Sequence, residues 1–379
     1  MVETANPTVA AGDNIGWEQK TAYQQWAESL GIPIHRGYFI PDARSVELGW
    51  WPERECNAAI LDLAGLENVS DVRVIEIPPG KTLPPYKFAM DDIAYVLDGS
   101  GLTTISGSDG KARHTFEWQK HSMFMLPRNS TYQLSNARGT QPARLLLSSY
   151  VPMAMSAQGD PSFFFNNPHS GDALLDAAEI SADARAVVQS FEQGGPAAGV
   201  FWYGNFFPNM RTWDNLAAFK SRGAGGSVVW VRFPRSPMVA HMSVFPAQTY
   251  KKGHRHGPGF VIVIPAGEGY SIMWPEGGEK VIVPWSEGTV FVPPNRWFHQ
   301  HFNLGQAPAR YLALHPPSFL AGFSEQIEDM ARDQIEYTNE EPWIRQRFEE
   351  ELKKRSLESQ MPAEAYRDRT YQWAYANAS

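Results

Sequence analysis

Short apolar runs, separated by glycine, proline and charged turns, dominate the middle of the chain. One run, Val72–Pro79, leads through a turn at Gly80 into the apolar segment Ile93–Leu97. A second set begins at His241–Pro246 and continues in Phe260–Ile264. Apolar runs of this length, bounded by turn residues, are typical of strands buried in a sheet. The pattern therefore predicts two strand-rich units.

The two units share one layout. Gly99 and Gly267 each follow the second apolar run and stand 168 residues apart. The tripeptide Pro142–Arg144 recurs as Pro308–Arg310, 166 residues further along. Because the offset shrinks so slowly over matched turn residues, we interpret the two units as an internal duplication of one all-β fold.

Helical periodicity is confined to the ends of the chain and to the connection between the units. Tyr23, Trp26 and Leu30 share one helical face, and Gly31 is a suitable residue to end that helix. A start signal at Asn339 precedes a second stripe, made of Ile344, Phe348 and Leu352. Two further helices are expected, over residues 172–191 and 212–222.

Composition narrows the function classes. The chain has 379 residues, a formal net charge of −8 and 43% hydrophobic residues. This balance indicates a folded protein and gives no basic surface for nucleic acid or for a membrane. The lone Cys56 excludes a disulfide framework and cysteine-rich metal sites. With no secretory signal and no apolar run long enough to span a membrane, we expect a cytoplasmic protein.

Three histidines carry the candidate chemistry. His254 and His256 are two residues apart on a predicted strand, so both imidazoles point to the same face. His299, on a neighbouring strand, can complete a facial set of three nitrogens. Such a set leaves about three open positions on an octahedral metal ion. The sequence therefore predicts a metal site formed by His254, His256 and His299.

The spacing of residues around these histidines resembles the two sequence motifs of the cupin superfamily. The positions that carry the resemblance are His254, His256, Phe260 and Gly267 for the first motif, and Gly288, Pro294, His299 and Asn303 for the second. Three positions depart from the family pattern. Gln248 and Arg296 replace glycines, and Phe260 replaces the glutamate that usually binds the metal.

Since the resemblance covers both units, it implies a bicupin, an all-β-dominated chain of two tandem double-stranded β-helix barrels with helical segments around them. The expected divisions are an N-terminal arm (1–70), a first barrel (71–155), a helical linker (156–225), a second barrel (226–318) and a helical C-terminal arm (319–379). In the first barrel, Tyr86, Phe88, Asp92 and Tyr132 stand at the ligand positions. We therefore expect that barrel to be a scaffold without metal.

Phe260 in place of the glutamate sets the charge of the predicted site. Three neutral imidazoles leave a divalent ion with its full charge, which favours a small anionic chelator as substrate. Among cupins, gentisate-type ring-cleaving dioxygenases and diketone-cleaving dioxygenases are similar in using three histidines and no acid. The resemblance implies an Fe(II) dioxygenase that uses O2 to cleave a carbon–carbon bond in an aromatic or enolic substrate.

Two other functions stay open. One is a non-redox decarboxylase, lyase or isomerase that uses Mn(II), Ni(II) or Zn(II) as a Lewis acid. The other is a binding protein of the cupin fold without turnover. Affinity order alone does not select iron, because imidazole ligands also suit copper and zinc.

Further candidates surround the predicted ligands. His301 shares the strand face of His299, and His241 precedes the first motif, so both are candidate catalytic bases. Tyr250, Phe260 and Trp297 are candidate substrate-binding residues. Because both arms are rich in aromatic residues, we also expect a homodimer or a larger even oligomer, unless the arms cover sheet edges of their own chain.

Overall fold

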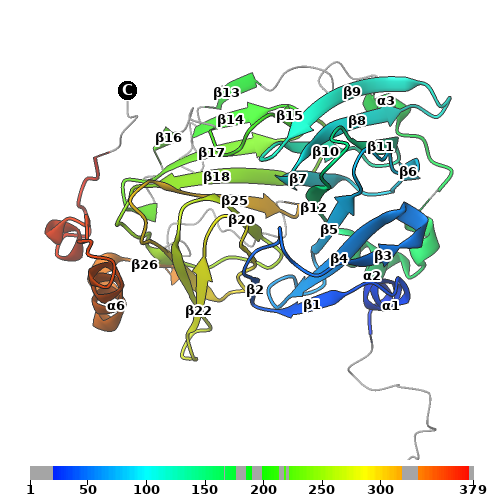
Figure 1. Cartoon of the computed structure of the whole chain (residues 1–379). Coiled ribbons are helices and arrows are strands. Elements are labelled where there is room, and N and C mark those ends of the chain that lie inside the picture. The colour runs from blue at the N-terminus through cyan, green and yellow to red at the C-terminus, as the bar shows by residue number, and fades with distance from the viewer. Residues whose placement is uncertain are drawn as a thin grey trace, which may run out of the picture.

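Strands dominate the computed structural model of the chain (Figure 1). The structure describes residues 20–165, 167–175, 185–189, 199–212, 217–218, 222–317 and 332–374. Within these ranges, no helix has both the length and the apolar character needed to cross a membrane. The α-helices described are α1 (Ala22–Ser29), α2 (Val151–Gln158), α3 (Asp172–Leu175) and α6 (Pro342–Lys353). The 3-10 helices described are η1 (Pro52–Arg54), η2 (Pro161–Phe164), η5 (Tyr337–Asn339) and η6 (Ala363–Tyr366).

The first barrel consists of a large and a small sheet. The large sheet has the order β1-β4-β5-β12-β7-β10-β15, with β3 beside β4. Its strands are β1 (Ile34–Gly37), β3 (Gly49–Trp51), β4 (Cys56–Leu63), β5 (Asp71–Ile77), β7 (Asp92–Asp98), β10 (Met123–Leu126), β12 (Ala143–Ser149) and β15 (Phe206–Phe207). The small sheet, β6-β11-β8-β9, has β6 (Tyr86–Lys87), β8 (Ser100–Ser106), β9 (Ala112–Gln119) and β11 (Thr131–Asn136).

The second barrel has the same plan. Its large sheet runs β13-β14-β17-β18-β25-β20-β23-β2, with β16 beside β17. These strands are β2 (Phe39–Ile40), β13 (Arg185–Gln189), β14 (Gly199–Tyr203), β16 (Ala217–Ala218), β17 (Ser227–Arg232), β18 (Val239–Phe245), β20 (Val261–Ala266), β23 (Val290–Phe291) and β25 (Ala309–His315). The small sheet, β22-β21-β24-β19-β26, has β19 (Gly253–His254), β21 (Gly269–Trp274), β22 (Val281–Trp285), β24 (Phe298–Asn303) and β26 (Gln334–Ile335).

The strand order confirms the internal duplication. The order β5-β12-β7-β10 in one large sheet is repeated as β18-β25-β20-β23 in the other, and β6-β11-β8-β9 is repeated as β19-β24-β21-β22. The turns repeat as well. Asn136 donates to the backbone carbonyl oxygens of residues 77, 78 and 141, and Asn303 donates to those of residues 245, 246 and 307. The chain therefore has the predicted bicupin fold of two tandem barrels.

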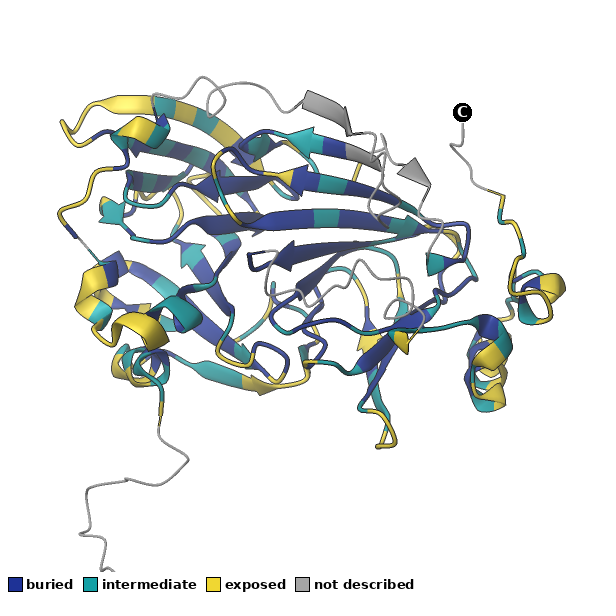
Figure 2. Ribbon diagram, turned by 180° about the vertical axis from the view of Figure 1, so that it is seen from behind, coloured by how far each residue is buried: buried dark blue, intermediate teal, exposed yellow. Residues whose placement is uncertain are grey.

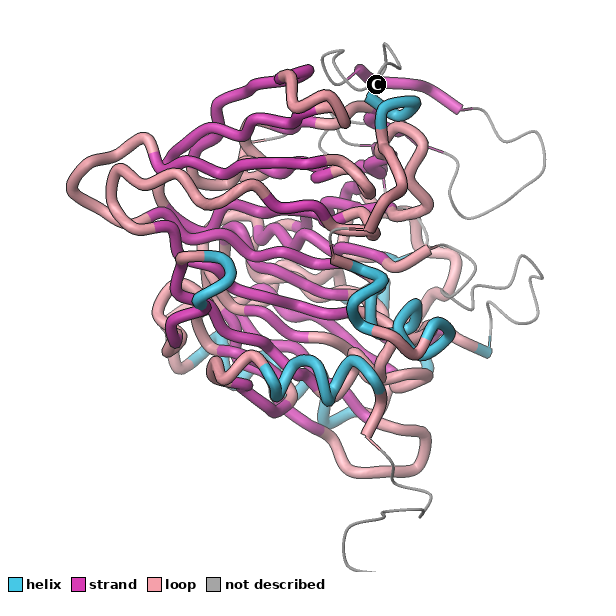
Figure 3. Tube along the Cα trace, turned by 90° about the vertical axis from the view of Figure 1, so that its right-hand side faces the viewer, coloured by secondary structure: helices cyan, strands magenta, loops and turns pink. Residues whose placement is uncertain are grey.

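The two large sheets pack against each other and bury the interface between the barrels. Apolar residues of β5, including Val72 and Val74, share one core cluster with Val229 of β17 and Met242 of β18. Most residues of β5 and β18 are buried, as the dark blue central strands of Figure 2 show. Figure 3 shows the strands running side by side across the whole molecule. The two barrels therefore form one body, with each lumen on the far side of its own large sheet.

The arm and linker differ from the sequence predictions. Residues 1–70 were expected to form an arm, but β1, β3 and β4 extend the large sheet of the first barrel, and β2 extends that of the second. The predicted helix over 172–191 is wrong in its described part: only α3 is helical, and Arg185–Gln189 is a strand. Within 212–222 the described residues include the short strand β16. Sheet edges recruit these segments because an unpaired strand edge offers unmatched hydrogen-bonding groups.

The two terminal helices agree with the predicted stripes. In α1, the Thr21 side chain caps the helix in a box with Gln24, and Gly31 follows its end with a φ of +66°. In α6, Ile344, Phe348 and Leu352 are buried. They pack with Tyr270 and Phe302 on the outer face of the small sheet of the second barrel.

This packing bears on the predicted oligomer. In the described parts of the arms, the aromatic residues lie mostly against their own chain. The large hydrophobic residues that the described ranges leave exposed are Tyr38, Trp50 and Phe163. The alternative in which the arms cover their own sheets thus accounts for most of the apolar surface on which the oligomer prediction depended. The homodimer or larger even oligomer stays a prediction.

A buried ion pair in the first barrel allows a prediction about stability. Arg73 is 2% exposed and lies between two wholly buried acids, donating to Asp71 at 2.5 Å and also to Asp92. Arg73→Leu is expected to lower the free energy of unfolding by about 3–5 kcal/mol, because it leaves two buried carboxylates without their cation. Arg36→Leu, which breaks the exposed pair with Asp62, is the matched control and should cost about 0–1 kcal/mol. Urea unfolding of both variants measures the difference, and equal losses would contradict the prediction.

Candidate metal centre

Two adjacent strands bring the three predicted ligands together. His254 on β19 and His299 on β24 stand directly opposite each other in an antiparallel pair. His256 follows two residues after His254 and therefore returns to the same side. One nitrogen from each of the three imidazoles lies within 4.8 Å of the other two. These residues form the one such cluster of potential metal ligands within the described ranges.

Backbone carbonyls orient all three imidazoles in the same way. The Nδ1 atom of His254 lies 3.4 Å from the Lys252 carbonyl oxygen, that of His256 2.8 Å from Gly257, and that of His299 3.2 Å from Trp297. Since a carbonyl only accepts, Nδ1 carries the proton, which leaves the lone pair of Nε2 available. Ligating histidines are commonly held in this way.

Burial keeps these imidazoles neutral. The three side chains belong to residues that are at most 6% exposed. Burial is the largest cause that lowers the pKa of His256 to about 4, and it lowers those of His254 and His299 well below the ordinary histidine value. The Arg222 guanidinium and the neighbouring imidazoles add to the effect on His254. Neutral nitrogens aimed at one point fit a divalent ion such as Mn(II), Fe(II), Ni(II) or Zn(II).

Phe260 lies beside this cluster. Its ring centroid is 4.1 Å from that of His256 and 4.2 Å from that of His315. The position that would bring a carboxylate in the usual cupin motif therefore presents an apolar ring to the site.

Two groups of further polar residues adjoin the ligands. His301 lies with its ring centroid 5.6 Å from that of His299, and its Nδ1 is 2.7 Å from the Ser271 hydroxyl oxygen. On the other side of Phe260, His241 and His315 form a hydrogen bond of 2.7 Å between ring nitrogens. The structure thus places both predicted bases, His301 and His241, near the cluster, with Phe260 and His315 between His241 and the ligands.

Several residues near the ligands belong to neither cupin motif and were not predicted from the sequence. Lys251 is fully buried, and its amino group donates to the Ser243 hydroxyl and lies 3.3 Å from the Tyr311 hydroxyl oxygen. Burial is the largest cause that lowers the pKa of Lys251 and brings that of Arg222 to about 10. His315 could have been noticed because it shares a strand face with Tyr311. Lys251 and Arg222 lie outside the strands, where a period of two says nothing about side-chain direction.

The other predicted substrate-binding residues lie further out. Tyr250 packs against Phe302 and Phe348 on the outer side of the small sheet, and its hydroxyl donates to Glu340. Its predicted contact with substrate does not agree with this position. Tyr250 pairs with Phe302 and His254 with His299, so the register shifts by one residue between them and turns Tyr250 to the outer face. The Trp297 ring contacts that of Tyr38 at 5.8 Å between centroids, while its carbonyl orients His299. Substrate contact by Trp297 stays a prediction.

The first barrel presents a different set at the matching positions. Tyr86 and Tyr132 face each other across β6 and β11, as His254 and His299 do in the second barrel. The Arg54 guanidinium lies 3.6 Å from the centre of the Tyr86 ring, and Asp92 pairs with Arg73. A protein cation against aromatic rings disfavours a metal ion at this place, so the first barrel remains our proposed scaffold.

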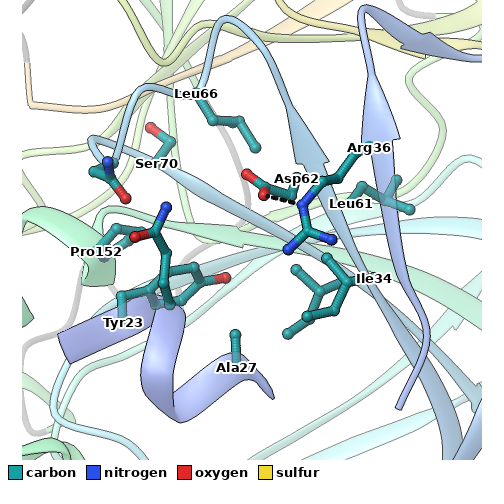
Figure 4. A pocket seen from close by; sticks show the side chains of 12 residues that line it. Tyr23, Ala27, Ile34, Arg36, Leu61, Asp62, Leu66, Ser70 and Pro152 are labelled. Carbon is teal, nitrogen blue, oxygen red and sulfur yellow. Dashed lines mark hydrogen bonds and ion pairs between the residues drawn. The ribbon is translucent and has the colours of Figure 1, made fainter. Parts of the chain in front are cut away.

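A separate small pocket lies between α1 and the strands β1 and β4 (Figure 4). Tyr23 reaches into it from the helix, and Arg36 and Asp62 pair at its rim. Its volume of about 20 Å³ is near that of one water molecule. The pocket is therefore too small to hold a substrate.

The buried histidines predict how stability depends on pH. Burial lowers the pKa of His256 to about 4 and that of His301 to about 3, while a histidine in the unfolded chain titrates near about 6.5. Between these values the unfolded chain binds protons that the folded chain does not. The free energy of unfolding of the metal-free protein should therefore fall as the pH is lowered from about 6.5 toward 4.

Glu340 provides the control for this measurement. Burial raises its pKa to about 7, so its contribution to stability is lost as the pH rises and opposes that of the histidines. Glu340→Gln should therefore steepen the loss of stability toward acid in urea unfolding of chelator-treated protein. A Glu340→Gln variant with constant stability between about pH 4 and 6.5 would contradict the prediction.

Comparisons with known proteins give distant likenesses. Neither a family model nor a curated protein matches the chain. Among solved structures, the chain is similar to a mutant of oxalate decarboxylase from Bacillus subtilis, with 12% identity, a TM-score of 0.47, and coverage of 76% of this chain and 78% of that chain. A second structure of that enzyme, determined in a study of its Mn(II) centres, shares 13% identity with a TM-score of 0.46 and the same coverage. Likenesses this distant carry no information about the reaction, and they give the gentisate-type resemblance no support.

Proposed function

We propose that the second barrel is the active site of a metal-dependent enzyme that acts on a small anionic chelating substrate by non-redox chemistry, such as decarboxylation. The observation that carries this proposal is the ring of proton-carrying side chains beside the three-histidine cluster. These side chains are His301, the His241–His315 pair, Lys251 and Tyr311. A divalent metal ion, when bound, would act as a Lewis acid that polarises a chelated carbonyl or carboxylate group.

Charge supports an anion as the substrate. The three ligands are neutral, and Phe260 brings no negative charge to the position where a glutamate is usual. The Arg222 guanidinium stays protonated at neutral pH, because its pKa is lowered only to about 10, and it acts electrostatically on His254. A substrate with one or two carboxylates would supply the missing negative charge.

The neighbouring residues suit proton transfer. When a carboxylate leaves as CO2, the electron pair of the broken carbon–carbon bond stays on the remaining carbon, which must then take a proton. We assign His301 to the relay of that proton. Burial lowers its pKa to about 3, so the imidazole is neutral and releases a proton from one nitrogen only as the other nitrogen accepts one. Its Nδ1 is bonded to Ser271, and its ring lies between those of His299 and Tyr311. The His241–His315 pair, whose ring nitrogens share a hydrogen bond, offers a second path for proton relay behind Phe260.

An Fe(II) dioxygenase of aromatic or enolic chelators is the second candidate. The specific observation in its favour is Phe260, because the resemblance to three-histidine dioxygenases depends on the lack of an acid at that position. A binding protein without turnover is the third candidate, since cupin folds serve more than one purpose.

One experiment separates these candidates. Protein purified without oxygen is loaded separately with Mn(II), Fe(II), Ni(II) or Zn(II) and incubated with dicarboxylates, hydroxy acids, keto acids, catechols and diketones. Turnover under argon, with CO2 or another product detected, supports the non-redox enzyme. Product formation that requires O2, with matching uptake at an oxygen electrode, would replace it with the dioxygenase. Tight substrate binding without product in either atmosphere would favour the binding protein.

A further inference from the structure

One carboxylate of the C-terminal arm contacts both segments that carry the metal ligands. Asp333 accepts hydrogen bonds from the Nε atom of Arg255 at 3.0 Å and from two Nη atoms of Arg296 at 2.9 and 2.5 Å. Its backbone carbonyl also accepts from the Arg255 amide at 3.0 Å. The Asp333 and Arg255 side chains are 13% and 9% exposed, so water screens their pair only weakly, whereas Arg296 is 37% exposed.

The two arginines stand next to the ligands in the sequence. Arg255 lies between His254 and His256, and Arg296 lies three residues before His299. The Arg296 amide donates to the His256 carbonyl at 2.9 Å, which joins the two ligand-bearing segments directly. Asp333 therefore bridges the first and second motifs from outside the barrel.

The strand that follows Asp333 completes the same sheet. Gln334 of β26 pairs with His254 of β19, so the arm occupies the free edge of the strand that carries a ligand. Figure 1 shows β26 beside the small sheet of the second barrel, on the path to α6. Both the backbone and the side chain of this segment thus hold the β19 strand in place.

The backbone conformation of two motif residues explains why these segments need support from the C-terminal arm. Arg296 replaces a glycine of the cupin motif and has a φ of +61°, in the left-handed region that side chains other than glycine rarely adopt. Gln248, at the other replaced glycine, has a φ of +51°, and its carbonyl accepts from the amide of Gln360 in the same arm. Both residues with left-handed backbone conformation therefore bond to the C-terminal arm, Arg296 through Asp333 and Gln248 through Gln360.

We propose that Asp333 is a positioning residue for the metal centre: its carboxylate holds the His254–His256 segment and the Arg296–His299 segment at the spacing that lets three imidazoles meet. The inference rests on the metal site of the proposed function. Loss of the carboxylate would remove the partner that the guanidiniums of Arg255, Arg296 and Arg332 share. It would also free the left-handed turn at Arg296. The three nitrogens would then have to be drawn together by the metal itself, at the expense of affinity.

The test measures metal binding rather than activity. Co(II) and Zn(II) are titrated into metal-free protein in competition with a chromophoric chelator, and the Co(II) absorption spectrum reports the ligand geometry. Asp333→Asn is expected to weaken the affinity about 10- to 100-fold and to change the Co(II) spectrum. Glu276→Gln is the matched control, because Glu276 also pairs with Arg255 but is 76% exposed, and it should leave both readouts unchanged.

Two further variants distinguish a positioning role from a general loss of folding. Arg255→Gln removes one of the arginines that Asp333 holds, so it should weaken metal binding as Asp333→Asn does. Arg296→Gly in the Asp333→Asn background restores the glycine of the motif and removes one unpartnered guanidinium, so the double variant should bind more tightly than Asp333→Asn alone. A merely structural role would lower the thermal midpoint of the metal-free protein without changing the Co(II) spectrum of the loaded protein.

The outcomes distinguish the two proposals. If the wild type binds Co(II) or Zn(II) and Asp333→Asn binds it equally well with the same spectrum, the positioning role is overturned and the metal site stands. If the wild type binds neither ion, both the metal site and the inference that rests on it fail.

Discussion

Replacing His254 and His256 together by alanine is expected to abolish metal binding, from one ion per chain to a background level. The structure brings one nitrogen from each of these residues and from His299 within 4.8 Å of one another, so the double variant leaves one ligand of three. A single imidazole cannot hold a divalent ion against water and buffer. Elemental analysis of protein purified without oxygen measures the metal content.

The matched control removes two histidines elsewhere. His114 and His169 lie outside the second barrel, and the His114 ring bonds to the carbonyl of Leu175. His114→Ala plus His169→Ala should therefore retain the full metal content. Two ions per chain in the wild type, or full metal content after loss of His254 and His256, would show that the site lies elsewhere.

Phe260→Glu is expected to tighten metal binding by about tenfold or more while it strongly weakens substrate binding and turnover. The Phe260 ring is 4.1 Å from that of His256, so a glutamate at this position can reach a bound ion. Its carboxylate would either take an open coordination position or lower the charge of the site by one. In the first case an anionic chelator has one coordination position fewer, and in the second the site attracts it less strongly. Metal titration and steady-state kinetics with a substrate from the proposed screen measure the two effects.

Phe260→Gln serves as the control for this change. Glutamine has nearly the shape of glutamate without its charge, so it should reproduce any loss due to packing but not the gain in metal affinity. Unchanged kinetics in a folded Phe260→Glu variant would mean that the side chain does not face the metal, in contradiction to its position beside His256 and His315.

Sequence patterns were sufficient for the fold and for the clustering of the three histidines. Matched turn residues revealed the duplication, which the strand orders of the two barrels repeat. The alternation of side chains along a strand placed His254 and His256 on one face. The resemblance to the second cupin motif placed His299 on a neighbouring strand, and the structure sets it opposite His254. The stripe of Ile344, Phe348 and Leu352 likewise gave a helix with one buried face.

Predictions based on periodicity failed where a neighbouring sheet decides the structure. Arg185–Gln189 was expected in a helix, yet it pairs with β14, because an available sheet edge outweighs weak helical preference. Tyr250 was expected to face the substrate, yet it packs under Phe348 of α6. That helix comes about 90 residues later in the chain, and no local pattern gives its position.

The sequence by itself determined the two barrels and the three imidazoles, because repeated turns and a period of two are properties of short stretches of chain. Only the tertiary structure decided what surrounds those imidazoles. Lys251, His315 and Asp333 come from a loop, a distant strand and the C-terminal arm, and they meet the site through packing between segments far apart in sequence. Burial lowers the pKa of Lys251 and of His315, since a low dielectric penalises charge. Burial alone would raise the pKa of Asp333, but hydrogen bonds from the arginines around it outweigh this and lower it.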